Sequence, residues 1–92
     1  MEQRVDTIII GSGICGLSSA HFLSKQSKDF LVLEASNNVG GIIQTENKSD
    51  FICENGPNTV LLNNDAIIEL LKDCDLWKSI IFPSEISNKN RY

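Results

Sequence analysis

Three glycines at fixed spacing, directly after a short run of β-branched residues, constrain this chain more than any other feature. Residues 5–10 end in three isoleucines, and Gly11, Gly13 and Gly16 follow at once. Such a run predicts a buried parallel strand that is covered on both faces. Apolar residues at three-residue steps then predict a helix over residues 13–26. The glycines therefore stand where a strand turns directly into a helix.

A second apolar run follows the helix and predicts a second strand. The helix is expected to lie on the sheet through Ile14, Leu17, Ala20 and Leu23. The second run, residues 30–33, comes after a polar break. A strand, a helix and a strand at this spacing form a βαβ unit, whose strands are parallel. The sequence therefore predicts an α/β fold with a Rossmann-like βαβ unit at about residues 5–35 and a parallel sheet. Two strands leave that fold incomplete.

Each glycine has a physical task if the turn holds a dinucleotide. Gly11 allows the tight turn, Gly13 lets the backbone approach a pyrophosphate, and Gly16 lets the helix lie close to the strand. The pyrophosphate then meets free N–H groups at the positive end of the helix dipole. Side chains, including the Cys15 thiol, are expected to matter little here. The predicted cofactor-binding residues of the turn are Gly11, Ser12, Gly13, Ile14, Cys15 and Gly16.

An acidic residue ends the second strand and supports the same interpretation. Glu34 lies 18 residues past Gly16. A carboxylate at this position accepts hydrogen bonds from the adenosine ribose hydroxyls and repels a 2′-phosphate. Glycine turns of this spacing also occur without a ligand, and a glutamate at a strand end can be merely solvated. Strand, turn, helix and acid in this order are nevertheless the context that the dinucleotide motif requires.

The middle of the chain predicts a hairpin. Residues 35–41 are interpreted as a loop. Two short stretches, residues 42–45 and 51–54, flank the polar residues 46–50 and predict two antiparallel strands. Residues 56–58 predict a further turn.

A second amphipathic helix is predicted over residues 66–74. Asn63, Asn64 and Asp65 are its candidate N-cap residues. Leu76 and Trp77 are expected to pack beneath it. The chain is thus predicted to form one N-terminal part of a dinucleotide-binding domain over residues 1–92, with the loop, hairpin and second helix at about residues 36–78.

Arg91 and Tyr92 resemble the start of another strand, at the C-terminal end of the chain.

Composition excludes several classes of function. A net charge of −4 and a sequence pI of about 4.7 argue against nucleic-acid binding. No apolar run approaches the ~20 residues of a membrane-spanning helix, and no secretory signal is recognisable, so a cytoplasmic location is expected. Cys15, Cys53 and Cys74 show neither disulfide nor metal-ligand spacing. No metal site is predicted, and the lone His21 is interpreted as a helix-surface or interface residue.

The segment from Glu34 to Gly41, which reads EASNNVGG, resembles the glycine-doublet FAD superfamily of amine oxidases, phytoene desaturases and protoporphyrinogen oxidases. The resemblance implies that Gly40 and Gly41 meet FAD through their backbone and that Ala35 and Ile42 also line it. Asn38 stands where the family usually has arginine, and Ile42 where arginine or lysine is common. A phosphate charge partner is therefore expected to be missing.

Residues 51–59, which read FICENGPNT, resemble the protoporphyrinogen oxidase form of the next family block. Amine oxidases usually differ at the Pro-Asn pair. The resemblance implies that Gly56, Pro57, Asn58 and Thr59 lie near the flavin end of FAD. An ordinary turn is the alternative interpretation of this segment.

The resemblance implies an FAD-dependent oxidoreductase of porphyrin and haem biosynthesis that oxidises protoporphyrinogen or coproporphyrinogen with flavin and oxygen. About a fifth of such an enzyme is expected here, without the substrate domain and without a catalytic acid or base. Peripheral membrane association and a homodimer are family expectations. A carotenoid desaturase or isomerase, an amine oxidase, and a truncated non-catalytic nucleotide-binding chain remain alternatives.

Overall fold

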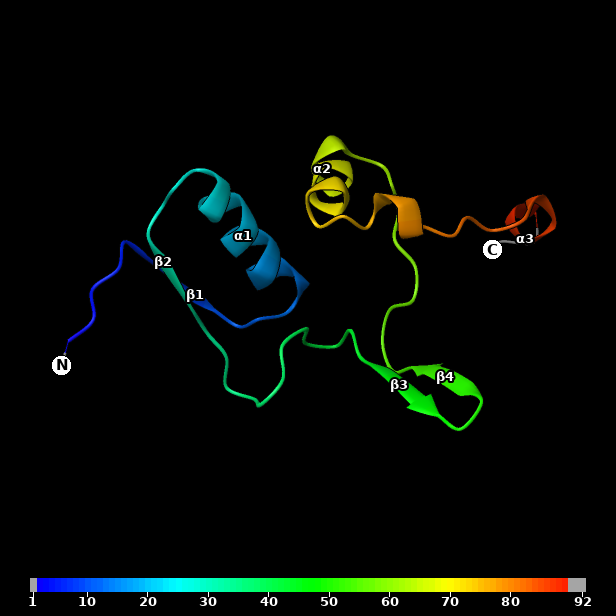
Figure 1. The fold of residues 1–92 in the computed structure, drawn as a ribbon, viewed down its shortest axis with the longest axis horizontal. Helices are drawn as coiled ribbons and strands as arrows, with labels where there is room; N and C mark the ends of the chain where they lie inside the picture. Colours follow the sequence, from blue (N-terminus) through cyan, green and yellow to red (C-terminus); the bar gives the residue numbers. More distant parts are fainter. Residues whose placement is uncertain (1, 90–92) are drawn as a thin grey trace. The chain divides into compact units, whose positions relative to one another are not determined.

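The computed structural model describes residues 2–89 and divides the chain into two compact units, residues 1–60 and 61–92 (Figure 1). The first unit holds β1 (Thr7–Ile10), α1 (Ile14–Lys25), β2 (Phe30–Leu33), β3 (Thr45–Lys48) and β4 (Phe51–Glu54). The second unit holds α2 (Asp65–Asp73), the 3₁₀ turn η1 (Trp77–Ser79) and α3 (Glu85–Lys89). The βαβ unit, the hairpin and the second helix predicted from the sequence are therefore all present.

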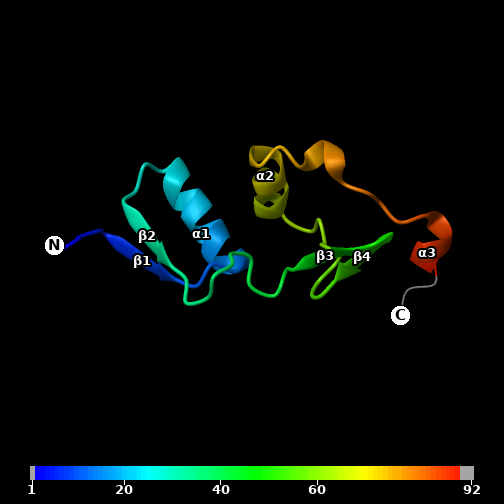
Figure 2. The same ribbon diagram turned by 60° about the horizontal axis from the view of Figure 1, so that its bottom comes forward.

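Strands β1 and β2 pair in parallel. Thr7 lies opposite Phe30 and Ile10 opposite Leu33. The Gly11 N–H continues the pairing by donating to the Leu33 carbonyl at 2.7 Å. In both views α1 lies along one face of this strand pair (Figures 1 and 2). The prediction of an α/β unit with parallel strands is confirmed.

The prediction that β1 is covered on both faces is wrong for the part of the chain that the structure describes. Burial alternates along the strand: Thr7 and Ile9 are half-buried, whereas Ile8 and Ile10 are 55% and 79% exposed. The covered residues face α1, and no described element covers the other face. An all-apolar strand is typical of a sheet with two covering layers, but residues 2–89 supply only one.

Helix α1 meets the strands through a narrower face than expected. Ala20 is buried and Leu23 half-buried, but Ile14 and Leu17 are 54% and 39% exposed. The contact line instead runs through Gly16, Ala20 and Leu23, which are four and three residues apart and share one side of a helix. The missing side chain at Gly16 lets the helix approach the strands there.

Helix α1 ends in a turn that the sequence does not signal with glycine. Ser27 has a φ of 56°, and the N–H of Lys28 donates to the Leu23 carbonyl at 3.0 Å. This hydrogen bond is the hallmark of the Schellman motif, in which the left-handed residue is most often glycine. Helix α2 ends in the same way at Asp75, whose φ is 58°.

The hairpin is confirmed, but its first strand was placed too early. Strand β3 begins at Thr45, not at Ile42, and a two-residue turn at Ser49 and Asp50 joins it to β4. The Thr45 hydroxyl donates to the Glu54 carboxylate at 2.7 Å across the strands. Because every β3 residue is exposed, no apolar alternation marks the strand, and the short turn sets its register instead.

In the second unit Asn64 is the N-cap of α2, one of the three candidates predicted from the sequence. The Asn64 side-chain oxygen accepts a hydrogen bond from the Ile67 N–H at 2.9 Å. The Lys72 ammonium lies 5.0 Å from the centre of the Trp77 ring, while Leu76 is 49% exposed. Trp77 therefore contacts α2 through its ring, and Leu76 contacts it through its N–H, which donates to the Leu71 carbonyl at 2.9 Å.

The tail contains a helix that the sequence analysis missed. The Ser84 hydroxyl oxygen accepts a hydrogen bond from the Ser87 N–H at 3.2 Å, as an N-cap does at the start of α3. The serine directly after Pro83 was the available signal. The strand predicted at Arg91–Tyr92 lies outside the described residues.

We expect Asn64→Ala to lower the free energy of unfolding of α2 by about 1 kcal/mol, because the Ile67 N–H loses its acceptor. Urea unfolding followed by circular dichroism at a helix wavelength measures this loss. Asn63→Ala is the matched control, since Asn63 only accepts a 3.5 Å contact from the Asn64 side chain. Equal losses in the two variants would contradict the capping role.

Candidate functional site

The turn between β1 and α1 presents unpaired backbone donors. Gly13 is the N-cap of α1 and offers no side-chain cap. The first helical hydrogen bond runs from the Leu17 N–H to the Gly13 carbonyl at 2.9 Å. The N–H groups of Ile14, Cys15 and Gly16 precede it and have no recorded partner within the described chain. The first turn carries no acidic side chain, so the positive end of the helix dipole is open to an anion.

Close contact between helix and turn depends on Gly16. A Cβ atom built at this position would overlap the Gly11 carbonyl oxygen and lie 3.3 Å from the Ile9 Cγ2 atom. No side chain fits there without displacing backbone. The task that the sequence analysis gave to Gly16 is therefore what the geometry requires.

The Glu34 carboxylate accepts hydrogen bonds from the glycine turn and from the loop after β2. Its Oε1 atom accepts hydrogen bonds from the Ser12 N–H at 2.8 Å and from the Ser12 hydroxyl at 2.7 Å. Its Oε2 atom accepts from the Ser36 N–H and the Ser36 hydroxyl, both at 2.9 Å. One side chain at the end of β2 thus joins the turn before α1 to the loop after β2.

These hydrogen bonds lower the pKa of Glu34 from its usual 4.5 to about 2. The Ser36 N–H is the largest cause, followed by the Ser12 N–H and then the two hydroxyls. All four donors stabilise the charged form. Because the folded-state pKa is lowered, the contribution of these bonds to stability is complete above about pH 4.5 and is lost as the pH falls through about 2.

Ser12 also connects the turn to the glycine doublet. It is only 1% exposed, and its carbonyl accepts a hydrogen bond from the Gly40 N–H at 2.7 Å. Gly40 has a φ of 106°, a conformation that other residues rarely adopt. A Cβ atom at Gly41 would lie 3.1 Å from the Gly13 Cα atom. The doublet therefore lies directly against the dinucleotide motif.

The remaining predicted residues divide into two groups. Ala35 follows Glu34 and is exposed, and Ile42 is 74% exposed at the end of the doublet loop. Gly56 lies against the Ile42 carbonyl, where an added Cβ would overlap that oxygen.

The other group is the segment after Gly56. Pro57, Asn58 and Thr59 are exposed, and no recorded hydrogen bond within residues 2–89 ties them to the turn. Their predicted position near the flavin end stays a prediction.

Two serine side chains were not anticipated. The sequence analysis expected side chains in the turn to matter little, yet the buried Ser12 hydroxyl donates a hydrogen bond to Glu34. Ser36 was not selected at all. A serine two residues from an acid is a recognisable local hydrogen-bonding pattern and was the available signal.

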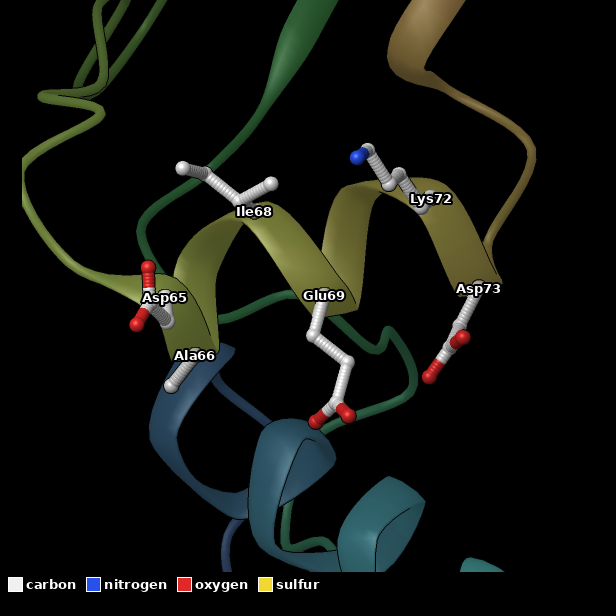
Figure 3. Close-up of a pocket in the computed structure, with 6 residues that line it drawn as sticks. All are labelled: Asp65, Ala66, Ile68, Glu69, Lys72 and Asp73. Atoms are coloured by element: carbon white, nitrogen blue, oxygen red, sulfur yellow. The ribbon is translucent and has the colours of Figure 1, made fainter.

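An open hollow lies beside α2 in the second unit, and none of the predicted site residues lines it. It is lined by Asp65, Ala66, Ile68, Glu69, Lys72 and Asp73, all from this one helix (Figure 3). Glu69 and Asp73 extend on the same side of the helix in this view. A surface made by one helix encloses no ligand, so the hollow is not a competing site.

The residues present fit the diphosphate of a dinucleotide. Unpaired N–H groups meet the helix dipole at the turn, and a Cβ atom at Gly11 would meet nothing within 4 Å, so the turn is open to an approaching ligand. An ionised acid stands at the end of the neighbouring strand. Fold and turn together define a Rossmann-like nucleotide-binding βαβ unit.

Residues 9–74 match the family model described as an NAD(P)-binding Rossmann-like domain. The chain belongs to this family. The description names NAD(P), and the match alone does not distinguish that cofactor from FAD. None of the helices in residues 2–89 is long and apolar enough to cross a membrane.

Several of the relatives are named as oxidases. The coproporphyrinogen III oxidases of Staphylococcus aureus and Bacillus subtilis are 44% and 39% identical to this chain, over 79% and 82% of its length. These matches cover 16% and 17% of the two relatives. An L-amino-acid oxidase of Crotalus adamanteus is 36% identical over 75% of the chain and 13% of the relative. The chain thus spans less than a fifth of each of these proteins.

We expect Gly16→Ala to lower the free energy of unfolding of the first unit by about 1–3 kcal/mol, the usual cost of overpacking. The added methyl group overlaps the Gly11 carbonyl oxygen. Urea unfolding monitors the loss. Ser19→Ala is the control on the same helix, because Ser19 is exposed and its hydroxyl bonds only the Cys15 carbonyl. A Gly16 variant as stable as this control would refute the close contact.

Glu34 is expected to titrate at a pKa of about 2 when its carboxyl carbon is followed by NMR. Ser36→Ala removes one hydroxyl donor and keeps the backbone donors, so the pKa rises but stays below 4.5. A wild-type Glu34 that titrates at its usual value would mean that the carboxylate is not held as described.

Proposed function

We propose that this chain forms the ADP-binding part of the FAD site in a flavin-dependent oxidoreductase. The observation that carries the proposal is the contact between the glycine doublet and the dinucleotide turn. The Gly40 N–H reaches the Ser12 carbonyl, and Gly41 lies against Gly13. A second glycine pair beside the first is the feature by which the sequence resembles the glycine-doublet FAD superfamily rather than a plain NAD site.

In this site the chain's own residues bind and orient the cofactor. Backbone N–H groups of Ile14, Cys15 and Gly16 would hold the pyrophosphate, and Glu34 would accept a hydrogen bond from the adenosine ribose. Ala35, Gly40, Gly41 and Ile42 would line the same half of the cofactor. The bound flavin would supply the redox chemistry, and no residue of the chain is assigned as a catalytic acid or base.

For the longer protein we favour oxidation of a porphyrinogen, either coproporphyrinogen III or protoporphyrinogen IX. Two relatives carry the name coproporphyrinogen III oxidase. The Gly56-Pro57-Asn58-Thr59 block also resembles the porphyrinogen oxidases more than the amine oxidases. Amino-acid oxidation is the second candidate, because a relative of that name is 36% identical to this chain.

The 92-residue chain is expected to bind FAD and ADP with affinities within about threefold of each other and not to bind FMN, which lacks the adenosine half. The reason is that the unpaired N–H groups assigned to the pyrophosphate and the Glu34 carboxylate all lie at the βα turn. Quenching of flavin fluorescence, with competition by ADP, measures the affinities. FMN binding as tight as FAD binding would refute the assignment of the ADP half.

The reaction is tested on a longer protein that contains this chain. Porphyrin fluorescence that grows from a porphyrinogen substrate supports the favoured activity. Hydrogen peroxide formed from amino acids, without porphyrin formation, would replace it with the second candidate and leave the cofactor proposal standing.

A further inference from the structure

The carboxylate of Glu34 has no free acceptor position. An ionised carboxylate offers about four lone-pair sites, two on each oxygen. Ser12 fills both sites of Oε1, and Ser36 fills both sites of Oε2. A ribose hydroxyl that donates to Glu34 must therefore replace a donor already present. The donor that can leave determines which oxygen of Glu34 accepts a hydrogen bond from the ribose.

The donors on Oε1 are fixed. Ser12 is 1% exposed, so its hydroxyl is shielded from water. The hydrogen bonds recorded within residues 2–89 give that hydroxyl no second acceptor, and a buried hydroxyl without a partner is costly. The Ser12 N–H belongs to the glycine turn, and the Ser12 carbonyl accepts a hydrogen bond from the Gly40 N–H. Displacing either donor would open the turn itself.

One donor on Oε2 has an alternative. The exposed Ser36 Oγ lies 2.9 Å from Oε2 and also 2.9 Å from the Asn38 carbonyl oxygen. A serine hydroxyl carries one hydrogen and can donate to only one of these acceptors. The Asn38 N–H donates to the same Oγ at 3.3 Å and holds it beside that carbonyl. Rotation of one O–H bond is enough to vacate a site on Oε2.

We infer that Glu34 reads a single ribose hydroxyl, through Oε2, while Ser12 keeps Oε1 occupied. The Ser36 hydroxyl yields its site and donates to the Asn38 carbonyl instead. The count of hydrogen bonds to the carboxylate stays the same, and the serine hydrogen turns to the Asn38 carbonyl oxygen that already lies 2.9 Å from Oγ. Ser12 and Ser36 are thus positioning residues that set the selectivity of the site. The inference rests on the proposed nucleotide site and specifies its ribose selectivity.

The test compares ADP, 2′-deoxy-ADP and 3′-deoxy-ADP as ligands of the 92-residue chain by calorimetric titration. One analogue is expected to bind about tenfold more weakly than ADP, as for a lost hydrogen bond to a charged group at an exposed site. The other is expected to bind within about twofold of ADP. Equal losses for the two analogues would overturn the inference and leave the nucleotide site intact.

Two variants separate the roles of the serines. Ser12→Ala vacates a site on Oε1. The analogue that the wild-type chain binds as well as ADP should then bind several-fold more weakly than ADP to this variant. Ser36→Ala leaves Oε1 held by Ser12, and selectivity for one hydroxyl should remain. If Ser12→Ala leaves the selectivity of the wild type, Ser12 does not restrict the carboxylate, and the inference fails.

The remaining outcomes are also decisive. Equal binding of ADP and both analogues would mean that Glu34 does not contact the ribose, which overturns the inference together with the proposed role of Glu34. Absence of ADP binding by the wild-type chain would instead remove the proposed function on which the inference rests. The NMR titration of Glu34 needs no ligand and shows separately whether the serine bonds form.

Discussion

The hydrogen bonds between Ser12 and Glu34 hold together the segments from which the nucleotide site is built. Glu34 ends β2, Ser12 lies in the turn that opens α1, and the Ser12 carbonyl receives the Gly40 N–H from the doublet loop. Parallel pairing brings the ends of β1 and β2 to the same edge. The serine and the acid then connect that edge to a loop that β-pairing does not reach.

Backbone requirements explain what could be predicted from the sequence. A β-branched run, glycines at the turn and helical periodicity each dictate a local conformation, and their order leaves a βαβ unit as the consistent solution. Burial was less predictable, because it depends on what covers an element. Ile8 and Ile10 have the composition of doubly covered residues, yet the described chain leaves them exposed. The bounds of β3 were missed for a related reason. All of its residues are exposed, so no buried face imposes an alternation of apolar and polar residues on its sequence.

The candidate site divides along the same line. Gly11, Gly13 and Gly16 follow from close approach, and Glu34 follows from its place at a strand end, so these four were accessible from spacing and context, whereas Gly40 and Gly41 were selected by resemblance. The hydroxyls of Ser12 and Ser36 act through short bonds whose direction depends on one dihedral angle. The periodicity of apolar residues does not predict such bonds. Pro57, Asn58 and Thr59 were selected by resemblance only, and nothing in the described structure ties them to the turn.

Weak burial makes the polar junction matter more than it would in a larger domain. Ser12 and Ala20 are the buried residues of the described chain, so little apolar area secures the turn. Glu34 concentrates four hydrogen bonds on one carboxylate. Because its pKa is lowered to about 2, this junction persists at any ordinary pH. A ligand that binds the folded turn stabilises it further by mass action, so a bound dinucleotide would supply order that the small core does not.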